Sequence, residues 1–481
     1  MAKIKRIGVK GKMFELISSY LRNRKAVTVV EGFKSYEVLL LAGVPQGSRL
    51  GPILFLIMIN DIITLMVATV LIFADDTTII ACGDNTSETV EVLNADLVKI
   101  SDWAKKWKVK FNGSKSKDLI FSREKLNNSA PLKLDGVLIE RVGSHKHLGL
   151  TLQPDLKWNI HLKKVIQHTS IKLSSLYNVK ELSRKTLDML YKLHIRSIMD
   201  YCLQVYGPEL SKADVGKLDK VQYRAARLVT KTPKSTSANR LNIDLGWEDT
   251  QTRIKFLSLC HFYKIICART RPLIRECLPP INQNFYNLRN SRMYDKYQFS
   301  DKILRRDLNM SFFPKVTNWW HELPQEVKKA IDDCDFAEKL RSHLIHPKNK
   351  LFNVGGRFGN SLHTQLRVGR SNLNSHLFKI GIAETTKCMC GHPNETAKHF
   401  LTECRLYSAL REKLYREIEG CLMNKITRYN KDDLTAILLN GEVSDERIPY
   451  NKVIFKKVQI FLINTRRLVH KPEIQVITPQ L

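Results

Sequence analysis

Alternating hydrophobic and polar positions divide the chain into a first part of short strands and helices and a second part that is mostly helical. Apolar residues recur at helical spacing over 13–21, alternate with polar ones over 26–41, and fill most of 52–65. These patterns predict a helix, a pair of hairpin strands, and a second helix buried on several sides. Two β-branched stretches, 67–73 and 77–81, predict two more strands.

The pattern then changes gradually from mixed structure to helix. Apolar residues at helical spacing predict a helix over 93–107. Further short strands are expected at 109–111, 119–121, 132–134 and 147–152. Helical periodicity dominates from 155 to 277, interrupted by a loop at 231–239, and a stretch with two prolines and several asparagines at 278–291 predicts a linker.

Charge indicates the class of partner. The 481 residues include 78 lysines and arginines against 47 aspartates and glutamates, a net charge of +31. A surplus of this size favours a polyanion, and its spread along the whole chain favours nucleic acid over a membrane surface.

Targeting signals and cysteines indicate the compartment. No apolar run reaches 18 residues, and no apolar stretch follows the basic segment Met1–Lys10. We therefore expect an intracellular protein of the nucleus or cytoplasm that is not secreted and has no membrane partner. The ten cysteines are expected to be reduced, so clustered ones are better interpreted as metal ligands than as disulfides. The oligomeric state stays open.

Two adjacent acids, Asp75 and Asp76, separate the two predicted β-branched strands. Carboxylates at the tip of a hairpin are suited to magnesium, which prefers hard oxygen ligands and leaves positions open for phosphate oxygens. Two such ions promote in-line displacement at phosphorus. The alternative is a hairpin turn whose acids point into water.

A loop with three glycines and two prolines, 42–52, precedes the apolar helix. Glycine permits close approach of a ligand to the backbone, Ser48 is a good helix N-cap, and Gln46 is suited to the edges of bases or sugars. The alternative is an ordinary strand-to-helix turn.

Together and in this order, these segments are specific. GVPQGSRLGP (43–52), an apolar helix that ends in Ile59-Asn60-Asp61-Ile62, and FADDT (73–77) closely resemble the palm of reverse transcriptases from non-LTR (LINE-type) retrotransposons, in particular the jockey-like group. The similarity continues over nearly the whole chain, through segments at 103–107, 111–117, 147–161, 218–227 and a Cys/His-rich region near the C-terminus.

The resemblance implies an α+β fold in which a partial polymerase palm, an antiparallel sheet with helices, precedes a helical thumb. The expected domains are a palm without fingers or first catalytic strand (1–152), thumb and connector (153–277), linker and helical segment (278–350), a CCHC zinc-knuckle-like domain (351–440) and a basic C-terminal tail (441–481).

The resemblance also implies an activity, which is RNA-templated DNA synthesis from a primer 3′-hydroxyl with deoxynucleoside triphosphates and two Mg²⁺ ions. Asp75 and Asp76 would hold the magnesium. Lys115 or Lys117 would neutralise or protonate the departing pyrophosphate, a role suited to a lysine ammonium. The template and nucleotide would contact Pro45, Gln46, Gly47 and Ser48, and the primer end would contact His147, Leu148 and Gly149.

One departure separates two hypotheses. In this family the first catalytic aspartate precedes the helix in which this chain begins, so the chain is expected to be truncated at its N-terminus. Asp61 and Asp84 are not on a strand that could replace it. The chain is therefore either a reverse transcriptase or a catalytically inactive remnant that binds nucleic acid through its basic surface, thumb and zinc knuckle.

The C-terminal cluster contains Cys388, Cys390, His399 and Cys404, four ligands of the number and type that a closed structural zinc site needs. His392 is a competing ligand. The alternative is a set of reduced cysteines and a surface histidine at the start of a helix over 396–414. The C-x-C spacing is tighter than usual, but the cluster resembles the CCHC segment that follows LINE polymerases, which implies one zinc ion and contact with single-stranded RNA.

Basic residues flank this cluster. The pairs Arg367 and Arg370, Lys456-Lys457 and Arg466-Arg467 are predicted to contribute to non-specific contacts with nucleic acid backbone. Trp319-Trp320 is predicted to lie in a core.

Overall fold

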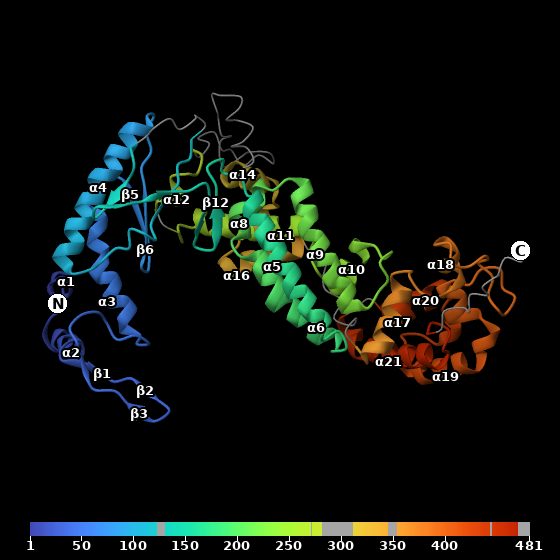
Figure 1. The fold of residues 1–481 in the computed structure, drawn as a ribbon. Coiled ribbons are helices and arrows are strands. Elements are labelled where there is room, and N and C mark those ends of the chain that lie inside the picture. The colour runs from blue at the N-terminus through green and yellow to red at the C-terminus, as the bar shows by residue number, and fades with distance from the viewer. Residues whose placement is uncertain (123–129, 271, 281–310, 345–353, 443–444, 470–481) are drawn as a thin grey trace, which may run out of the picture. The chain divides into compact units, whose positions relative to one another are not determined.

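The fold is a mixture of helices and small sheets, seen in a computed structural model of the chain (Figure 1). The structure describes residues 1–122, 130–270, 272–280, 311–344, 354–442 and 445–469. It divides into two compact units, Met1–Lys157 and Trp158–Leu481. Most of the predicted linker at 278–291 lies outside the described residues.

The first unit contains four principal helices and six two-stranded sheets among its described residues. The helices are α1 (Ala2–Arg6), α2 (Gly11–Leu21), α3 (Leu50–Ile59) and α4 (Thr86–Trp107), and the 3₁₀ helix η1 (Asn60–Leu65) continues α3. The strand pairs are β1 (Arg24–Ala26) with β4 (Val38–Leu40), β2 (Val29–Val30) with β3 (Phe33–Lys34), β5 (Thr69–Phe73) with β6 (Asp76–Ile80), β7 (Lys117–Asp118) with β10 (Glu140–Arg141), β8 (Lys133–Leu134) with β9 (Val137–Leu138), and β11 (His145–His147) with β12 (Leu150–Leu152). All pairs are antiparallel except β7 with β10.

The core of the first unit lies between α4 and the β5–β6 hairpin. Buried residues of α4, among them Leu97, Ile100 and Trp103, form a cluster with η1, and Ile72 and Ile79 of the hairpin pack against it. Figure 1 shows α4 beside this hairpin. The helical periodicity of α4 therefore provides the surface on which the hairpin is supported.

Several expectations for the first unit are wrong, among them the strand at 119–121, since β7 ends at Asp118. Helix α3 is not buried on several sides, because Ile53 and Leu56 are 53% and 48% exposed while Leu54 packs in a small core with α1 and α2. A helix that is apolar all around does not specify which side is covered. Residues 109–111 form no strand, since Val109 and Phe111 pack instead against the core beside α4.

The second unit is helical throughout its described residues. Its first group of helices comprises α5 (Asn159–Tyr177), α6 (Arg184–Tyr191), a π-helical turn η2 (Lys192–Arg196), α7 (Ser197–Asp200), α8 (Leu203–Tyr206), α9 (Lys212–Thr230), α10 (Ala238–Leu245), α11 (Thr250–Ile266), α12 (Pro272–Arg275), α14 (Phe312–Glu322), α15 (Gln325–Lys328) and α16 (Asp333–Leu344). Its second group comprises α17 (Arg357–Arg367), α18 (Asn374–Lys379), a π-helical turn η5 (His399–Glu403), α19 (Ser408–Ile418), α20 (Lys431–Asn440) and α21 (Ile448–Asn464).

Buried apolar side chains such as Leu173, Tyr191 and Leu218 fill the space between the first helices of this unit, and two further apolar cores are described. One joins α11, α14 and α16 and includes Trp320 at 4% exposure, which confirms the core position predicted for it. The other joins α17, α19, α20 and α21 and includes Phe400 and Phe455, both fully buried. We call the residues around the second core, 354–469, the C-terminal domain.

The prediction of a basic tail from 441 onward is wrong. Ile454, Phe455 and Val458 of α21 are fully buried in the core of the C-terminal domain. The lysines of this helix alternate with apolar residues at helical spacing, so that one side of the helix packs while the other is charged.

The glycine-rich loop is fixed to the start of α3 by a close backbone approach. The Ser48 hydroxyl donates to the Pro45 carbonyl (2.9 Å) and accepts a hydrogen bond from the Gly51 amide (3.0 Å). The N-cap of α3 is Arg49 and not the predicted Ser48, which lies one residue earlier and accepts from the first turn of the helix. A Cβ atom on Gly51 would lie 2.8 Å from the Pro45 carbonyl oxygen.

We predict that Gly51→Ala destabilises the first unit by about 1–3 kcal/mol, because either the loop or the helix must move to relieve this contact. Urea unfolding followed by circular dichroism measures the loss. Gly143→Ala is the matched control, since a Cβ atom there meets no other atom within 4 Å. Equal stability of the two variants would contradict the close approach.

Candidate functional site

Asp75 and Asp76 lie at the tip of the β5–β6 hairpin, as their position between two strands predicts. Phe73 pairs with Asp76, so that Ala74 and Asp75 form a two-residue turn in which Ala74 has φ +52°. Both aspartates are exposed. The turn therefore presents two carboxylates to solvent from a paired, rigid base.

A buried carboxylate of α4 anchors the start of this hairpin. Asp96 accepts hydrogen bonds from the amides of Val67 (2.9 Å) and Ala68 (2.8 Å), and Lys99 donates to its other oxygen (2.8 Å). Burial acts to raise the pKa of Asp96, but these hydrogen bonds outweigh it and lower the pKa. The sequence gives one indication of this anchoring role, which is that Asp96 is an acid next to the apolar side of a predicted helix.

The acids nearest in sequence do not complete a metal site. Asp61 accepts hydrogen bonds from Lys3 (2.7 Å) and from the Trp103 indole (2.9 Å), and the Lys3 ammonium lies over the Trp107 ring. Burial acts to raise the pKa of Asp61, but the Lys3 and Trp103 hydrogen bonds lower it overall. Among the described residues, no group of three or more potential ligands within 4.8 Å includes Asp75 or Asp76.

The two candidate lysines have different surroundings. Lys115 is exposed in the turn before β7, and its described hydrogen bonds are to Asn112 through the backbone amide. Lys117 lies on β7 and forms an ion pair with Glu140. Burial lowers the pKa of His145, as do the charges of His147 and Lys117, while Asp76 acts in the opposite direction. The charges of Lys117 and Asp76 therefore both act on His145.

The predicted nucleotide and template loop is held at both ends. The Arg24 guanidinium donates to the carbonyls of Ala42 (2.8 Å) and Gly43 (2.7 Å), and the bonds of Ser48 hold the other end. Between them Gln46 and Gly47 are exposed, and Gly47 has φ +79°, a conformation that glycine adopts without strain. Pro45 is half-buried beneath them.

The predicted primer-binding segment is a hairpin and not a continuous strand over 147–152. Leu148 (φ +45°) and Gly149 (φ +86°) form the two-residue turn between β11 and β12. Two successive positive φ angles match the right-handed twist of a hairpin. The His147 Nε2 atom lies 3.4 Å from the Thr78 hydroxyl on β6, so this hairpin contacts the one that carries the aspartates.

The C-terminal cluster brings all four predicted ligands together. The ligand atoms of Cys388, Cys390, His399 and Cys404 lie within 4.8 Å of one another. The sulfurs of Cys388 and Cys404 are 3.7 Å apart, and Cys390 Sγ is 3.2 Å from His399 Nε2. Two thiolates at about 2.3 Å from a tetrahedral zinc ion lie about 3.8 Å apart, so the donor set fits zinc.

Neighbouring groups orient these ligands. His399 Nδ1 faces the Glu403 carboxylate at 3.5 Å, an outer contact that would fix the ring with Nε2 toward the metal. Backbone amide hydrogen bonds, the first from His392, lower the pKa of the Cys390 thiol. Burial is the largest influence on the Cys388 thiol and raises its pKa to about 12.

The competing ligand, His392, is less well placed. Its ring stacks on that of His399 at 4.0 Å with an interplanar angle of 15°, and its Nδ1 lies 2.9 Å from the Asn394 carbonyl. Imidazole lone pairs lie in the ring plane, so two nearly parallel rings do not direct them at one ion. The geometry therefore favours His399.

Not every basic residue near the cluster is available to nucleic acid. Arg367 is buried in an ion pair with Asp244 (2.9 Å). Arg467 binds the buried carboxylate of Glu395 through two bonds, of 2.8 and 2.5 Å. The predicted backbone contacts of these two arginines are wrong, because their charges are neutralised inside the protein, whereas Lys456 and Arg466 are exposed.

Comparisons with known proteins find a matching family and several relatives. Residues 1–152 match the family model described as reverse transcriptase (RNA-dependent DNA polymerase). The chain is a relative of the reverse transcriptases of non-LTR retrotransposons.

Three curated relatives illustrate this. The chain is 26% identical over half its length to a probable RNA-directed DNA polymerase from transposon BS of Drosophila melanogaster. It is 26% identical over 85% of its length to a Pol polyprotein from the type-1 element R1 of Bradysia coprophila, and 28% identical over 46% to the polymerase of the mobile element jockey of D. melanogaster. It spans 28%, 38% and 25% of these relatives, respectively.

The similarity to retrotransposon reverse transcriptases confirms the family inferred from the GVPQGS and FADDT segments. It agrees with the mixed α/β fold of the first unit. Among the described helices, none combines the length and hydropathy that a membrane span requires.

We predict that Asp96→Asn destabilises the first unit by about 1–3 kcal/mol at pH 7, because a neutral amide cannot replace the carboxylate toward two amides and Lys99. The folded pKa is lowered, so the stabilisation is complete above the unfolded pKa of about 3.9 and is lost as pH falls through the folded value. Urea unfolding at several pH values should therefore show the two proteins converging below about pH 4.

Asp102→Asn is the control for this experiment, since Asp102 is exposed on the same helix. A destabilisation by Asp102→Asn as large as that by Asp96→Asn would contradict the anchoring role.

We predict that purified protein contains one zinc ion and that Cys404→Ser reduces its content to near zero, because the loss of one of four ligands opens a closed site. Elemental analysis after gel filtration measures this. His392→Ala and Cys334→Ser, a cysteine exposed on α16, should keep the zinc. Loss of zinc in His392→Ala with retention in His399→Ala would reverse the ligand assignment.

Proposed function

We propose that this chain carries out part or all of RNA-directed DNA synthesis, in which the 3′-hydroxyl of a primer attacks the α-phosphate of a deoxynucleoside triphosphate and pyrophosphate leaves. The observation that supports this best is the contact between the aspartate hairpin and the β11–β12 hairpin through Thr78 and His147. This contact joins two separate two-stranded sheets, of which one carries the proposed metal ligands and the other the proposed primer-binding turn. The first unit also matches the reverse transcriptase family over residues 1–152.

In this proposal the first unit is a polymerase palm, and the helices up to about residue 277 form a thumb and connector. The C-terminal domain, 354–469, replaces the small zinc knuckle and tail as one body, because α21 lies in its core. Nucleic acid, as RNA template and DNA primer, is the proposed partner, supported by the net charge of +31.

The residues of the palm have distinct proposed roles. The exposed backbone at Gln46 and Gly47 would contact template and nucleotide, and Leu148 and Gly149 would hold the primer end. Of the two candidate lysines, Lys115 is exposed and Lys117 is paired with Glu140, so both remain candidates for the pyrophosphate.

Magnesium at Asp75 and Asp76 is part of this proposal. The ion would supply positive charge for the attacking hydroxyl and the triphosphate. Two carboxylates are too few to fix two ions, and the described residues add no third ligand. A complete two-metal site thus requires a further carboxylate, and we assign no step to a metal pair.

The lack of a third ligand for Asp75 and Asp76 among the described residues favours a second candidate, a protein that binds nucleic acid without polymerising. The basic surface, the helices of the second unit and the Cys/His cluster remain intact in such a protein. Binding would then depend on salt, because lysine and arginine release counterions from phosphates.

Primer extension on an RNA template with Mg²⁺ tests the first candidate. The first candidate requires extension by the purified chain and predicts a loss of at least about 100-fold in Asp75→Asn, since changes to outer-shell groups alone cost roughly 10–100-fold. Asp84→Asn, an exposed acid just beyond the hairpin, should leave extension unchanged.

A binding measurement separates the two candidates. Fluorescence anisotropy with a labelled primer–template duplex should give the same affinity for the parent and Asp75→Asn. No extension by the parent together with tight, salt-dependent binding would establish the second candidate and overturn the first.

A further inference from the structure

The C-terminal domain joins the preceding helices through polar contacts. Among the described residues, the apolar cluster around α21 contains no residue of α6, α9 or α10. Helix α17 instead meets α6, α9 and α10 through guanidinium groups. Two such contacts cap carbonyls, since Arg357 donates to Leu228 O (3.1 Å) and Arg240 donates to Val368 O (2.6 Å).

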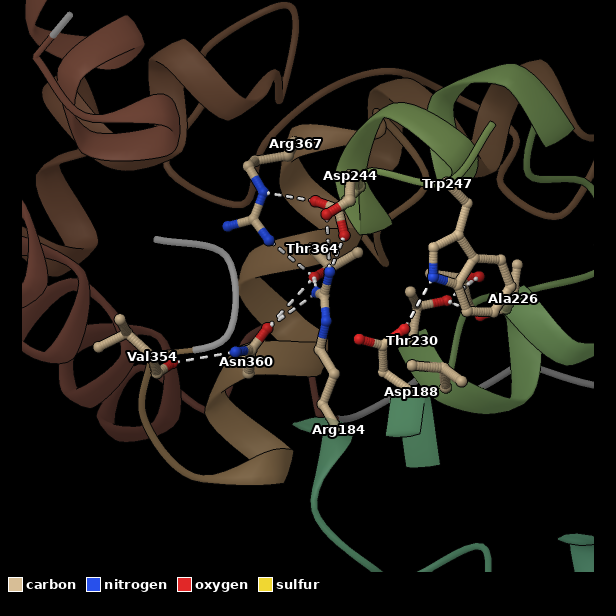
Figure 2. A network of polar contacts seen from close by, with 12 residues as sticks. Arg184, Asp188, Ala226, Thr230, Asp244, Trp247, Val354, Asn360, Thr364 and Arg367 are labelled. Atoms are coloured by element: carbon tan, nitrogen blue, oxygen red, sulfur yellow. Dashed lines mark hydrogen bonds and ion pairs between the residues drawn. The ribbon is translucent and has the colours of Figure 1, made fainter. Parts of the chain in front are cut away.

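A buried charge triad lies at the centre of this junction (Figure 2). The carboxylate of Asp244 accepts from Arg184 Nη2 (2.6 Å) through one oxygen and from Arg367 Nε (2.9 Å) through the other. The three side chains come from α10, α6 and α17 and are only 4–5% exposed. One carboxylate therefore connects two helices of the bundle to the C-terminal domain.

Hydrogen bonds from both arginines extend the triad along α17. Arg184 Nη1 donates to Asn360 Oδ1 (3.1 Å) and to Thr364 Oγ1 (2.8 Å), and Arg367 Nη2 donates to the same hydroxyl (2.8 Å). Asn360 in turn donates to the Val354 carbonyl (2.9 Å), as Figure 2 shows. Because hydrogen bonds are directional, this set of bonds can form in only one rotation of α17 about its axis and one position along it.

The triad contains two cations and one anion. Unpaired charges are costly inside a protein, so each arginine depends on Asp244, while the loss of one arginine still leaves a balanced pair. The three residues are thus not equivalent, and the aspartate should contribute most to the junction.

We propose that the Arg184–Asp244–Arg367 triad is a docking latch that fixes the metal-binding C-terminal domain in one orientation on the helices of the bundle. Because the apolar cluster of the C-terminal domain contains no residue of α6 or α10, loss of the triad should undock α17 from these helices without unfolding that cluster. The latch would hold the Cys/His cluster and the basic helix α9 in a fixed position relative to each other. The proposal stands whether or not the chain polymerises DNA.

Hydrogen–deuterium exchange of the full chain, read by mass spectrometry, tests the latch. In Asp244→Asn the amides of α10 and α17 should exchange roughly tenfold faster or more, because two buried guanidinium groups lose their counter-charge. Amides of α21 and α11, which lie in the two cores, should stay within about twofold of the parent.

Arg184→Met keeps the pair of Asp244 with Arg367 and provides a milder variant that should fold. It should accelerate exchange in α10 and α17 by less than Asp244→Asn does. Asp214→Asn removes an acid at the surface end of α9 and should leave α10 and α17 unchanged.

Two outcomes would overturn the latch. The first is uniform acceleration of α10, α17, α11 and α21 in Arg184→Met or Asp244→Asn, which would show one cooperative body with no separable junction. The second is an effect of Arg184→Met equal to or larger than that of Asp244→Asn, which would show that the shared carboxylate is not the centre of the junction.

Discussion

The arrangement of this protein depends on buried carboxylates whose charge is matched by donors from distant segments. Asp96 holds the amides of Val67 and Ala68, and so decides where the strand that leads to the aspartate pair begins. Asp244 holds two arginines that are 183 residues apart in the sequence (184 and 367). A carboxylate removed from water must be paired, so each of these acids permits few arrangements of the segments around it.

The same constraint changes the interpretation of the basic surplus. A net charge of +31 indicates a polyanionic partner, but Arg184, Arg367 and Arg467 use their charge inside the fold. Guanidinium groups suit this role because their planar donors satisfy a carboxylate at two points. The lysines remain largely at the surface and are the better candidates for phosphate contacts.

The Cys/His cluster also depends on its surroundings. Phe400 and Leu401 lie between its histidine and its last cysteine and are fully buried in the C-terminal core. Glu395, bound to Arg467, reaches within 3.7 Å of Cys388 Sγ. The proposed zinc would therefore stabilise a helical domain together with its apolar core, whereas an isolated knuckle depends on its metal alone.

The sequence by itself determined the family and the local elements that carry it. GVPQGS and FADDT are short, contiguous segments whose chemistry and spacing are visible without a fold, and the hairpin at Asp75 follows from β-branched strands on either side. The four residues of the Cys/His cluster were likewise predicted as ligands from the sequence, and the structure brings their ligand atoms within 4.8 Å of one another.

The tertiary structure decided which partner each buried charge has and which side of each helix is covered. No local pattern distinguishes Asp96 and Asp244 from surface acids, because, apart from Lys99 on the same helix as Asp96, their donors come from residues about 30 to 120 positions away. The helix at 50–59 is apolar on all sides, so only packing could show that Ile53 and Leu56 stay exposed. Periodicity along a chain identifies an element, but charge pairing and burial depend on contacts between elements.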